Sequence, residues 1–368
     1  MTAVDARDAG APDGGAPFDF RAVFKVALVV IPLGVLGNLA FSLLATDRAI
    51  LSALDEFPRQ WLAVAVGLTL VPWLTRPLRL LIWTRFLGYR LGLVEAFQKV
   101  LAVDLGASVS PTAVGGGFLK WGMLVDRGVS GGTAASLTAL PTLEDAVFFA
   151  IALPTAVVLT AAWEFGTWTN VAGTAATRVL VLVALAAVIF LVVLLLSKAV
   201  VEGLLGVRTR QWTVRRLARA RRGLRSAWAD ARGVFGLIRD HGKARFAVSL
   251  ALTAIQWSAR YSVITALAAF LGAPVKPVLF WGLQWIVFTL MSLMPTPGAA
   301  GGAEVTFALV YGSLLPAGVL GVATAGWRFL TFYLQVGTAA VLFPLLARFT
   351  PSGPIPRLDP ANARPESV

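Results

Sequence analysis

The segment that decides the fold spans residues 292–304 and reads SLMPTPGAAGGAE. A second segment, residues 108–120, reads SVSPTAVGGGFLK, and each of the two interrupts a hydrophobic stretch. They align without gaps, because Pro295 corresponds to Pro111 and the glycine and charged positions after each proline keep the same offset. Proline and glycine break or kink a helix. The chain is therefore predicted to be a duplicated unit with one broken element in each half.

The composition is that of an integral membrane protein. Of the 368 residues, 57% are hydrophobic and only 14% are charged, whereas soluble domains have about 25% charged residues. The absence of cysteine excludes disulfides and thiol chemistry, and a single histidine, His241, excludes a multi-histidine metal site. We expect no metal and no cofactor. The net charge of +13 is concentrated between the hydrophobic segments, so we expect no nucleic-acid partner.

Hydrophobic runs near the ~20 residues that cross a bilayer recur along the chain. They predict an all-α integral membrane protein with about six full transmembrane helices. The predicted spans are Val26–Ala45, Gln60–Trp83, Thr133–Ala161, Ala176–Leu196, Phe246–Leu271 and Pro316–Leu346. The last one is long enough for one helix or two. The broken segments, Glu95–Val125 and Pro277–Leu315, are predicted to be Pro/Gly-broken re-entrant hairpins.

The positions of the cations predict the orientation in the membrane. The connection Lys198–Arg245 is rich in arginine and belongs in the cytoplasm, as do Arg85 after the second span and Arg348 after the sixth. The loops at 46–59 and 163–174 hold few cations and belong outside. Both termini are then cytoplasmic, in a multi-pass protein of the cell membrane. Because three full spans separate the hairpins, one hairpin enters from each face, and the halves form an inverted repeat.

The chain is predicted to hold a single polytopic membrane domain, residues 22–350. The polar tails on either side, residues 1–21 and 351–368, are expected to be disordered. The repeat halves cover about residues 60–162 and 244–347 and are joined by a basic cytoplasmic linker, residues 198–245.

Within this linker, apolar residues recur at helix-like intervals among the arginines of residues 208–245. The pattern indicates an amphipathic helix that lies on the inner leaflet and binds its anionic lipids. An ordinary basic loop is the alternative.

Four charged residues lie in apolar surroundings at equivalent places in the two halves. Lys120 aligns with Glu304, and Glu144 aligns with Arg328, so the members of each pair differ in sign. A charge at mid-membrane costs at least ~2.5–3.5 kcal/mol on insertion scales, so the four must be paired or face water or a charged ligand. One hypothesis is internal ion pairs that lock the halves together. The other is a central polar cavity, in which the cations contact anionic groups and the carboxylates contact cationic groups or couple to protons. Two further candidates for the cavity are Asp104 and Asp145.

The residues of the two breaks form a second group of substrate-binding candidates. Glycines at the start of a helix permit positive φ and expose N–H groups that bind anions, although tight helix packing also favours glycine in membranes. Proline ends the preceding helix, and the adjacent threonines can satisfy freed carbonyls. These candidates are Pro111, Thr112, Gly115, Gly116, Gly117, Pro295, Thr296, Pro297, Gly298, Gly301 and Gly302.

These residues resemble the membrane part of the lysylphosphatidylglycerol synthase and flippase-like family over roughly residues 25–350. The resemblance rests on Pro-Thr-Pro-Gly at 295–298 with the glycine and glutamate that follow, on the Gly-Gly-x-x-x-Lys element that ends at Lys120, and on Glu144 and Arg328. Two features depart from the family pattern. Ala299 and Ala300 separate the glycines of the second break, and the Glu-Arg-x-x-Asp often found in the family is replaced at Glu144.

The resemblance implies movement of a lipid or a lipid-linked headgroup between the leaflets. Relatives that make aminoacylated lipids carry a soluble transferase domain, which is not visible here, nor is an ATPase motif, so we expect no enzyme activity. Two alternatives remain: a polyprenyl-dependent membrane glycosyltransferase, for which the acidic Asp55-Glu56 would be the cue, and a non-transporting membrane partner or regulator. The expected partners are membrane lipids with an anionic headgroup, and a homo-oligomer is compatible with the sequence.

Overall fold

The computed structural model describes residues 57–110, 115–160, 232–233, 236–294, 296–351 and 353–357, and within these ranges the fold is all-helical. Several predicted features lie outside the described residues: the spans Val26–Ala45 and Ala176–Leu196, most of the basic linker, and Asp55-Glu56.

The four predicted spans that fall in the described residues each coincide with a helix, although α8, at the predicted span Phe246–Leu271, is not among those apolar enough to count as membrane-spanning. In chain order they are α3 (Arg59–Phe86), α4 (Leu93–Val109), α5 (Gly115–Asp126), the helix Gly131–Thr160, α8 (Lys243–Phe270), α9 (Pro277–Ser292), α10 (Gly302–Tyr311), α11 (Ala317–Arg328), a π-helical turn (Phe329–Tyr333) and α12 (Leu334–Ala347). Among the described residues, three helices are long and apolar enough to cross a membrane: Arg59–Phe86, Gly131–Thr160 and Gly318–Ala347. The last predicted span is therefore one helix, which continues through the π-helical turn.

The helix boundaries repeat with the offset found in the sequence. α3 and α8 have 28 residues each. Each end of α8 lies as many residues after the matching end of α3 as Pro295 lies after Pro111. Each ends in a Schellman turn around a glycine with positive φ, Gly88 (78°) and Gly272 (65°). In each turn the N–H after the glycine donates to a carbonyl of the last helical turn, at 2.8 and 3.0 Å. The ends of these two helices and the turns after them thus repeat with the same offset as the two breaks.

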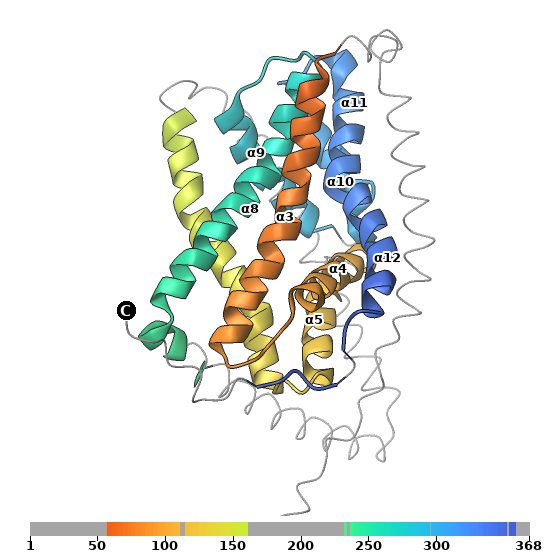
Figure 1. Cartoon of the computed structure of the whole chain (residues 1–368). Coiled ribbons are helices and arrows are strands. Elements are labelled where there is room, and N and C mark those ends of the chain that lie inside the picture. The colour runs from red at the N-terminus through yellow and green to blue at the C-terminus, as the bar shows by residue number, and fades with distance from the viewer. Residues whose placement is uncertain are drawn as a thin grey trace, which may run out of the picture.

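α3 and α8 pack against each other. α4 also packs against α3, and α9 and α11 pack against α8. The colours of Figure 1 show that α3 runs down the view and α8 runs up it. The shorter helices α4 and α5 lie in the lower half of this view, and α9 and α10 lie in the upper half. At ~1.5 Å per residue these four helices are only about 15–26 Å long, less than the ~30 Å thickness of the hydrocarbon core.

Each half has its own hydrophobic core. The core of the second half is built around Phe280, Phe307 and Trp327, all almost wholly buried. The core of the first half includes Trp83 and also Ile355, which lies beyond the last helix.

The C-terminal segment, residues 353–357, crosses the base of the first half. The N–H of Ile355 donates to the carbonyl of Arg127 at 2.8 Å, and the N–H of Arg90 donates to the carbonyl of Pro356 at 2.8 Å. The guanidinium of Arg357 lies over the ring of Tyr89, 5.7 Å from its centroid. The end of the described chain is thus held against the turns that connect the helices of the first half.

We expect Gly116→Ala to lower the free energy of unfolding by about 1–3 kcal/mol, because overpacking a tight helix contact forces the backbone apart. A Cβ at Gly116 would lie 2.5 Å from the carbonyl oxygen of Val103 on α4. The matched control on the same helix is Gly122→Ala, since nothing lies within 4 Å of the Cβ position there. Alanine favours a helix over glycine, so the control should be neutral or stabilising. Thermal unfolding in detergent measures both, and equal effects would contradict the packing role of Gly116.

Candidate functional site

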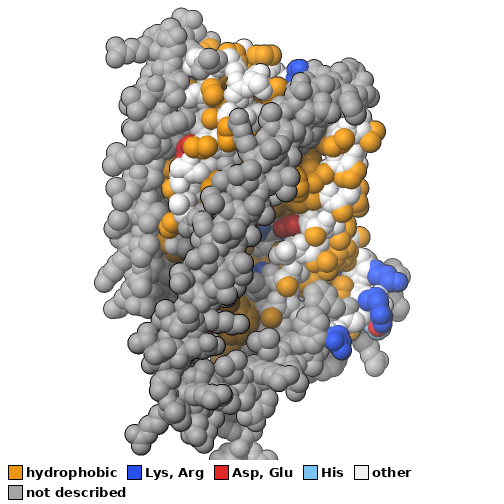
Figure 2. All heavy atoms as spheres, turned by 180° about the vertical axis from the view of Figure 1, so that it is seen from behind, with side chains coloured by type: hydrophobic (Ala, Val, Ile, Leu, Met, Phe, Trp, Pro, Cys, Tyr) orange, Lys and Arg blue, Asp and Glu red, His pale blue; other side chains and the backbone are white. Residues whose placement is uncertain are grey.

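A cavity of about 380 Å³ lies between α3, α4, α5, the helix Gly131–Thr160 and α8. Five of its lining side chains are cationic and two are carboxylates, and we call it the cationic cavity: Arg76, Arg79, Lys99, Lys120, Arg260, Asp104 and Asp145. Figure 2 shows acidic and basic side chains inside a recess at mid-height, between hydrophobic surfaces. Clustered cations inside an apolar helix bundle are the chemistry that an anionic ligand requires.

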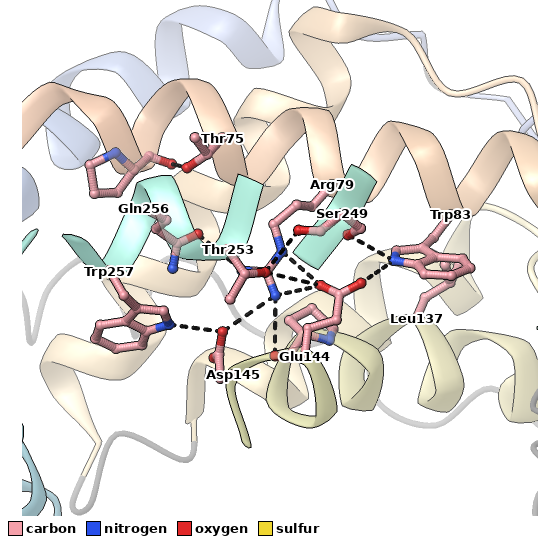
Figure 3. A network of polar contacts seen from close by, with 12 residues as sticks. Thr75, Arg79, Trp83, Leu137, Glu144, Asp145, Ser249, Thr253, Gln256 and Trp257 are labelled. Atoms are coloured by element: carbon pink, nitrogen blue, oxygen red, sulfur yellow. Dashed lines mark hydrogen bonds and ion pairs between the residues drawn. The ribbon is translucent and has the colours of Figure 1, made fainter. Parts of the chain in front are cut away.

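Glu144 does not line this cavity, although the sequence made it a candidate for substrate binding. Its side chain is completely buried, and Figure 3 shows it surrounded by donors. Arg79 donates from Nε and Nη2 to Oε2 at 2.8 and 2.6 Å, and Trp83 Nε1 donates to Oε1 at 2.6 Å. Glu144 therefore takes part in a buried ion pair that joins α3 to the helix Gly131–Thr160. Both partners lie in the first half, whereas the ion-pair hypothesis had the pairs lock the two halves together.

Arg79 is the residue that the sequence reasoning missed. Its Nη1 donates to Gln256 Oε1 at 3.0 Å, and its Nη2 donates to the carbonyl of Pro141 at 3.1 Å, so it links three helices. A signal was present, because an arginine inside the apolar span Gln60–Trp83 must have a partner.

Asp145, beside Glu144, lines the cationic cavity and retains 26% side-chain exposure. Trp257 Nε1 donates to its Oδ1 at 2.9 Å, and Arg79 approaches the same oxygen at 3.4 Å. The adjacent carboxylates thus have different surroundings, since one is enclosed by donors and the other faces the cavity.

Lys120 lines the cationic cavity from α5. Its Nζ donates to the carbonyl of Leu137 at 2.8 Å, and in the described part of the chain no carboxylate lies within ion-pair distance of it. Two other lining cations are neutralised. Arg76 Nη1 lies 2.7 Å from Asp104 Oδ1, and Lys99 Nζ lies 2.8 Å from Oε1 of Glu95. Lys120 is therefore a cation available to a ligand.

The second half holds its own buried pair, which lies outside the cationic cavity. Arg328 Nε is 3.3 Å from Glu304 Oε1, and Nη2 donates to the carbonyl of Gly298. The guanidinium lies 4.1 Å from the ring centroid of Phe332. Within the described residues, Glu304 Oε2 and Arg328 Nη1 have no hydrogen-bond partner. Of the four aligned charges, the structure brings only this pair together.

A second pocket of about 210 Å³ is mostly apolar, and we call it the apolar pocket. Its large apolar side chains come from the segment that precedes the second break and from the last helix: Phe288, Met291, Met294, Phe332 and Val336. Asp104, Ala107 and Arg260 line both this pocket and the cationic cavity, so the two spaces adjoin.

The glycines of the breaks fall into two groups. Gly117 lines the cationic cavity and Gly298 lines the apolar pocket. Gly115 and Gly116 instead pack against α4, where an added Cβ would lie 2.7 and 2.5 Å from backbone carbonyl oxygens. The alternative reading of glycine as a packing residue therefore applies to these two.

The second break has an irregular backbone. Pro297 begins a short 3-10 turn, and the hydroxyl of Thr296 donates to the carbonyl of Ala300 at 3.0 Å. Gly301 has a φ of 77° with open space at its Cβ position, whereas Gly302 lies against Met294. Three candidates lie outside the described residues: Pro111, Thr112 and Pro295.

The all-helical fold, the membrane-length helices and the internal cationic cavity define a polytopic membrane protein with a ligand-sized space inside it. Residues 23–338 match the family described as the lysylphosphatidylglycerol synthase TM region, and the chain belongs to that family. The chain is also 27% identical over 300 residues to a "UPF0104 membrane protein" of Archaeoglobus fulgidus, an alignment that covers 76% of this chain and 85% of that protein. The family resemblance drawn from the Pro-Thr-Pro-Gly break is confirmed.

Proposed function

We propose that the protein moves a lipid with an anionic headgroup between the leaflets, in the manner of a flippase, and that the headgroup passes through the cationic cavity. The observation that carries the proposal is this cavity of about 380 Å³, in which Lys120 has no carboxylate partner among the described residues. An unneutralised charge in a low-dielectric interior is costly, and an anionic headgroup would offset that cost. Membrane lipids surround such a helix bundle, so a lipid with an anionic headgroup is the anionic ligand that it meets.

The arrangement of the helices supports a layout suited to this task. α4 with α5, and α9 with α10, are too short to cross the membrane and lie in opposite halves of Figure 1, as two re-entrant hairpins would. The opposite directions of α3 and α8 support an inverted repeat. The turn Pro297–Ala299 packs against α4, so the second break lies against the first arm of the other proposed hairpin. Inverted repeats with broken helices at mid-membrane suit alternating access to a central site.

The distribution of basic residues supports the proposed orientation. In Figure 2, many of the visible Lys and Arg side chains gather at the lower edge. The basic end of α3 and the C-terminal segment meet through the bridge between Tyr89 and Arg357. This edge is therefore the proposed cytoplasmic face. We further propose that the protein has six full spans, that both termini are cytoplasmic and that it lies in the cell membrane. The basic linker, residues 198–245, is proposed to bind anionic lipids of the inner leaflet.

A reconstituted transport assay tests the function. We expect wild-type protein in vesicles to move a fluorescent short-chain phosphatidylglycerol faster than the matching phosphatidylcholine. Lys120→Gln should slow the anionic lipid by about tenfold or more, the effect of losing one charged hydrogen bond. The readout is the fraction of outer-leaflet label that an impermeant quencher removes over time.

The control for this assay is Lys243→Gln, which removes an exposed lysine at the start of α8. The control should match wild type. Equal rates for Lys120→Gln and wild type would contradict the role of the cavity. A wild-type protein that moves neither lipid would favour the non-transporting partner instead.

A further inference from the structure

We infer that Arg260 binds the phosphate group of an amphiphilic ligand where the cationic cavity and the apolar pocket adjoin, and that the ligand's hydrocarbon chain lies in the apolar pocket. The inference deepens the proposed lipid transport and rests on it for the identity of the ligand as a lipid. It assigns a role to a residue and a pocket that the sequence did not include among the binding candidates.

The first step is a difference between the two halves at equivalent positions. Arg260 and Arg76 are related by the same offset as the two breaks, so the two arginines correspond. In the first half, Asp104 neutralises Arg76 at 2.7 Å. The residue that corresponds to Asp104 is Phe288, and the guanidinium of Arg260 lies over its ring, 5.0 Å from the centroid. The second half has the arginine but a phenyl ring in place of the carboxylate.

The second step is that the remaining contacts of Arg260 do not compensate its charge. Nη1 reaches Gln335 Oε1 at 3.4 Å and Nη2 reaches the carbonyl of Thr331 at 3.5 Å, both at the long limit for a hydrogen bond. Nε is buried and has no hydrogen-bond partner within the described residues. A cation–π contact recovers only part of the desolvation of a guanidinium. Arg260 is therefore a partly buried cation that forms no ion pair with a carboxylate of the described residues, since Asp104, the carboxylate that interacts with it, is paired with Arg76.

The third step is the position of this cation. Arg260 lines both spaces, together with Asp104 and Ala107. On one side lies the cationic cavity, where Lys120 is the other cation without a carboxylate. On the other side lies the apolar pocket, with the side chains of Met291 and Phe332. A charged space joined to an apolar one through an unneutralised arginine has the polarity of an amphiphile.

The chemistry of the two cations indicates a phosphate ester. The planar guanidinium of arginine presents paired donors that match phosphate oxygens, and lysine adds a compact charge. With Arg76, Arg79 and Lys99 occupied by carboxylates, Arg260 and Lys120 are the lining cations left for a ligand. A phosphomonoester or phosphodiester headgroup fits this pair of cations. Free inorganic phosphate also fits them, but it has no hydrocarbon chain to occupy the apolar pocket.

The experiment measures binding rather than transport, so it separates this inference from the proposed function. The purified full-length protein in non-ionic detergent is titrated with three probes: dioctanoyl phosphatidic acid, inorganic phosphate and dioctanoylglycerol. We expect the first to bind about tenfold or more tightly than either of the others, because only it fills both spaces. Equal affinity for inorganic phosphate would assign the site to a free anion and overturn the role of the apolar pocket.

Two variants with opposite expected effects identify the residue. Arg260→Gln should weaken binding of the phosphatidic acid by about ten- to a hundredfold, the loss of charged hydrogen bonds. Asp104→Asn leaves Arg76 without its carboxylate beside the junction and should tighten binding severalfold. If Arg260→Gln unfolds, the Asp104→Asn variant still decides, since unchanged or weaker binding there would overturn the inference.

The matched control is Arg245→Gln. Arg245 lies on α8 like Arg260 and also contacts a phenyl ring, that of Phe86 at 4.9 Å, but it is exposed and lines neither space. The affinity of the Arg245→Gln variant for the phosphatidic acid should equal that of wild type. Binding that follows these expectations without lipid movement in vesicles would contradict the proposed function alone. Lipid movement with equal binding by wild type and Arg260→Gln would contradict this inference alone.

Discussion

Replacing Arg79 with alanine is expected to lower the free energy of unfolding by about 3–5 kcal/mol, because one partner of a buried ion pair would be left uncompensated. Glu144 is completely buried, and Arg79 supplies two of its donors, at 2.8 and 2.6 Å. Without the guanidinium, Glu144 would keep the indole of Trp83 but no charge of opposite sign. The loss should appear as a large fall in the thermal unfolding midpoint of the detergent-solubilised protein.

The control for this prediction is Arg85→Ala, which removes an exposed arginine from the last turn of the same helix. Its midpoint should stay close to that of wild type. The double variant Arg79→Met/Glu144→Met should regain much of the lost stability, because apolar replacement of both partners leaves no buried charge. A double variant as unstable as Arg79→Ala would show that the pair is not the source of the effect.

Arg328→Ala should also cost about 3–5 kcal/mol, since it leaves the buried carboxylate of Glu304 without its cation. It would also remove the donor to the carbonyl of Gly298 and the contact with Phe332. Lysine should restore little, because a guanidinium makes these contacts together and an ammonium cannot. Thermal unfolding followed by tryptophan fluorescence measures the effect, with the neighbouring Trp327 in the core as one reporter.

The matching control is Arg348→Ala, an exposed arginine directly after α12, which should leave stability unchanged. Adding Glu304→Gln to Arg328→Ala should recover part of the loss, because a neutral amide is less costly to bury than a carboxylate. If Arg328→Ala alone proves as stable as wild type, Glu304 has another cation or is neutral in the protein.

The breaks and the span boundaries could be predicted because they arise from local causes. Proline and glycine act through their own backbone geometry, and α4 ends at Val109 and α5 begins at Gly115, on either side of Pro111. The length of the hydrophobic run predicted the span Gln60–Trp83. This span lies within α3, and its first and last residues are close to the first and last residues of that helix. The constant offset between the halves was visible in the sequence and recurs in the ends of α3 and α8.

The partners of the buried charges could not be predicted, because they depend on packing between distant segments. The alignment gave Arg328 as the residue equivalent to Glu144 and said nothing of the partner of Glu144, which is Arg79. Corresponding positions also need not keep corresponding contacts, as Phe288 in the place of Asp104 shows. Lys120 lines the cationic cavity, and its charge could be noticed from the sequence because a lone cation in an apolar segment must face water, a partner or a ligand.

The C-terminal segment makes the first half of the chain depend on residues that follow the second half. By sequence, residues 353–357 follow the second half, but Ile355 completes the hydrophobic core of the first. Because the core of the first half includes a side chain from beyond the second, the two halves expressed separately would not be equivalent subunits.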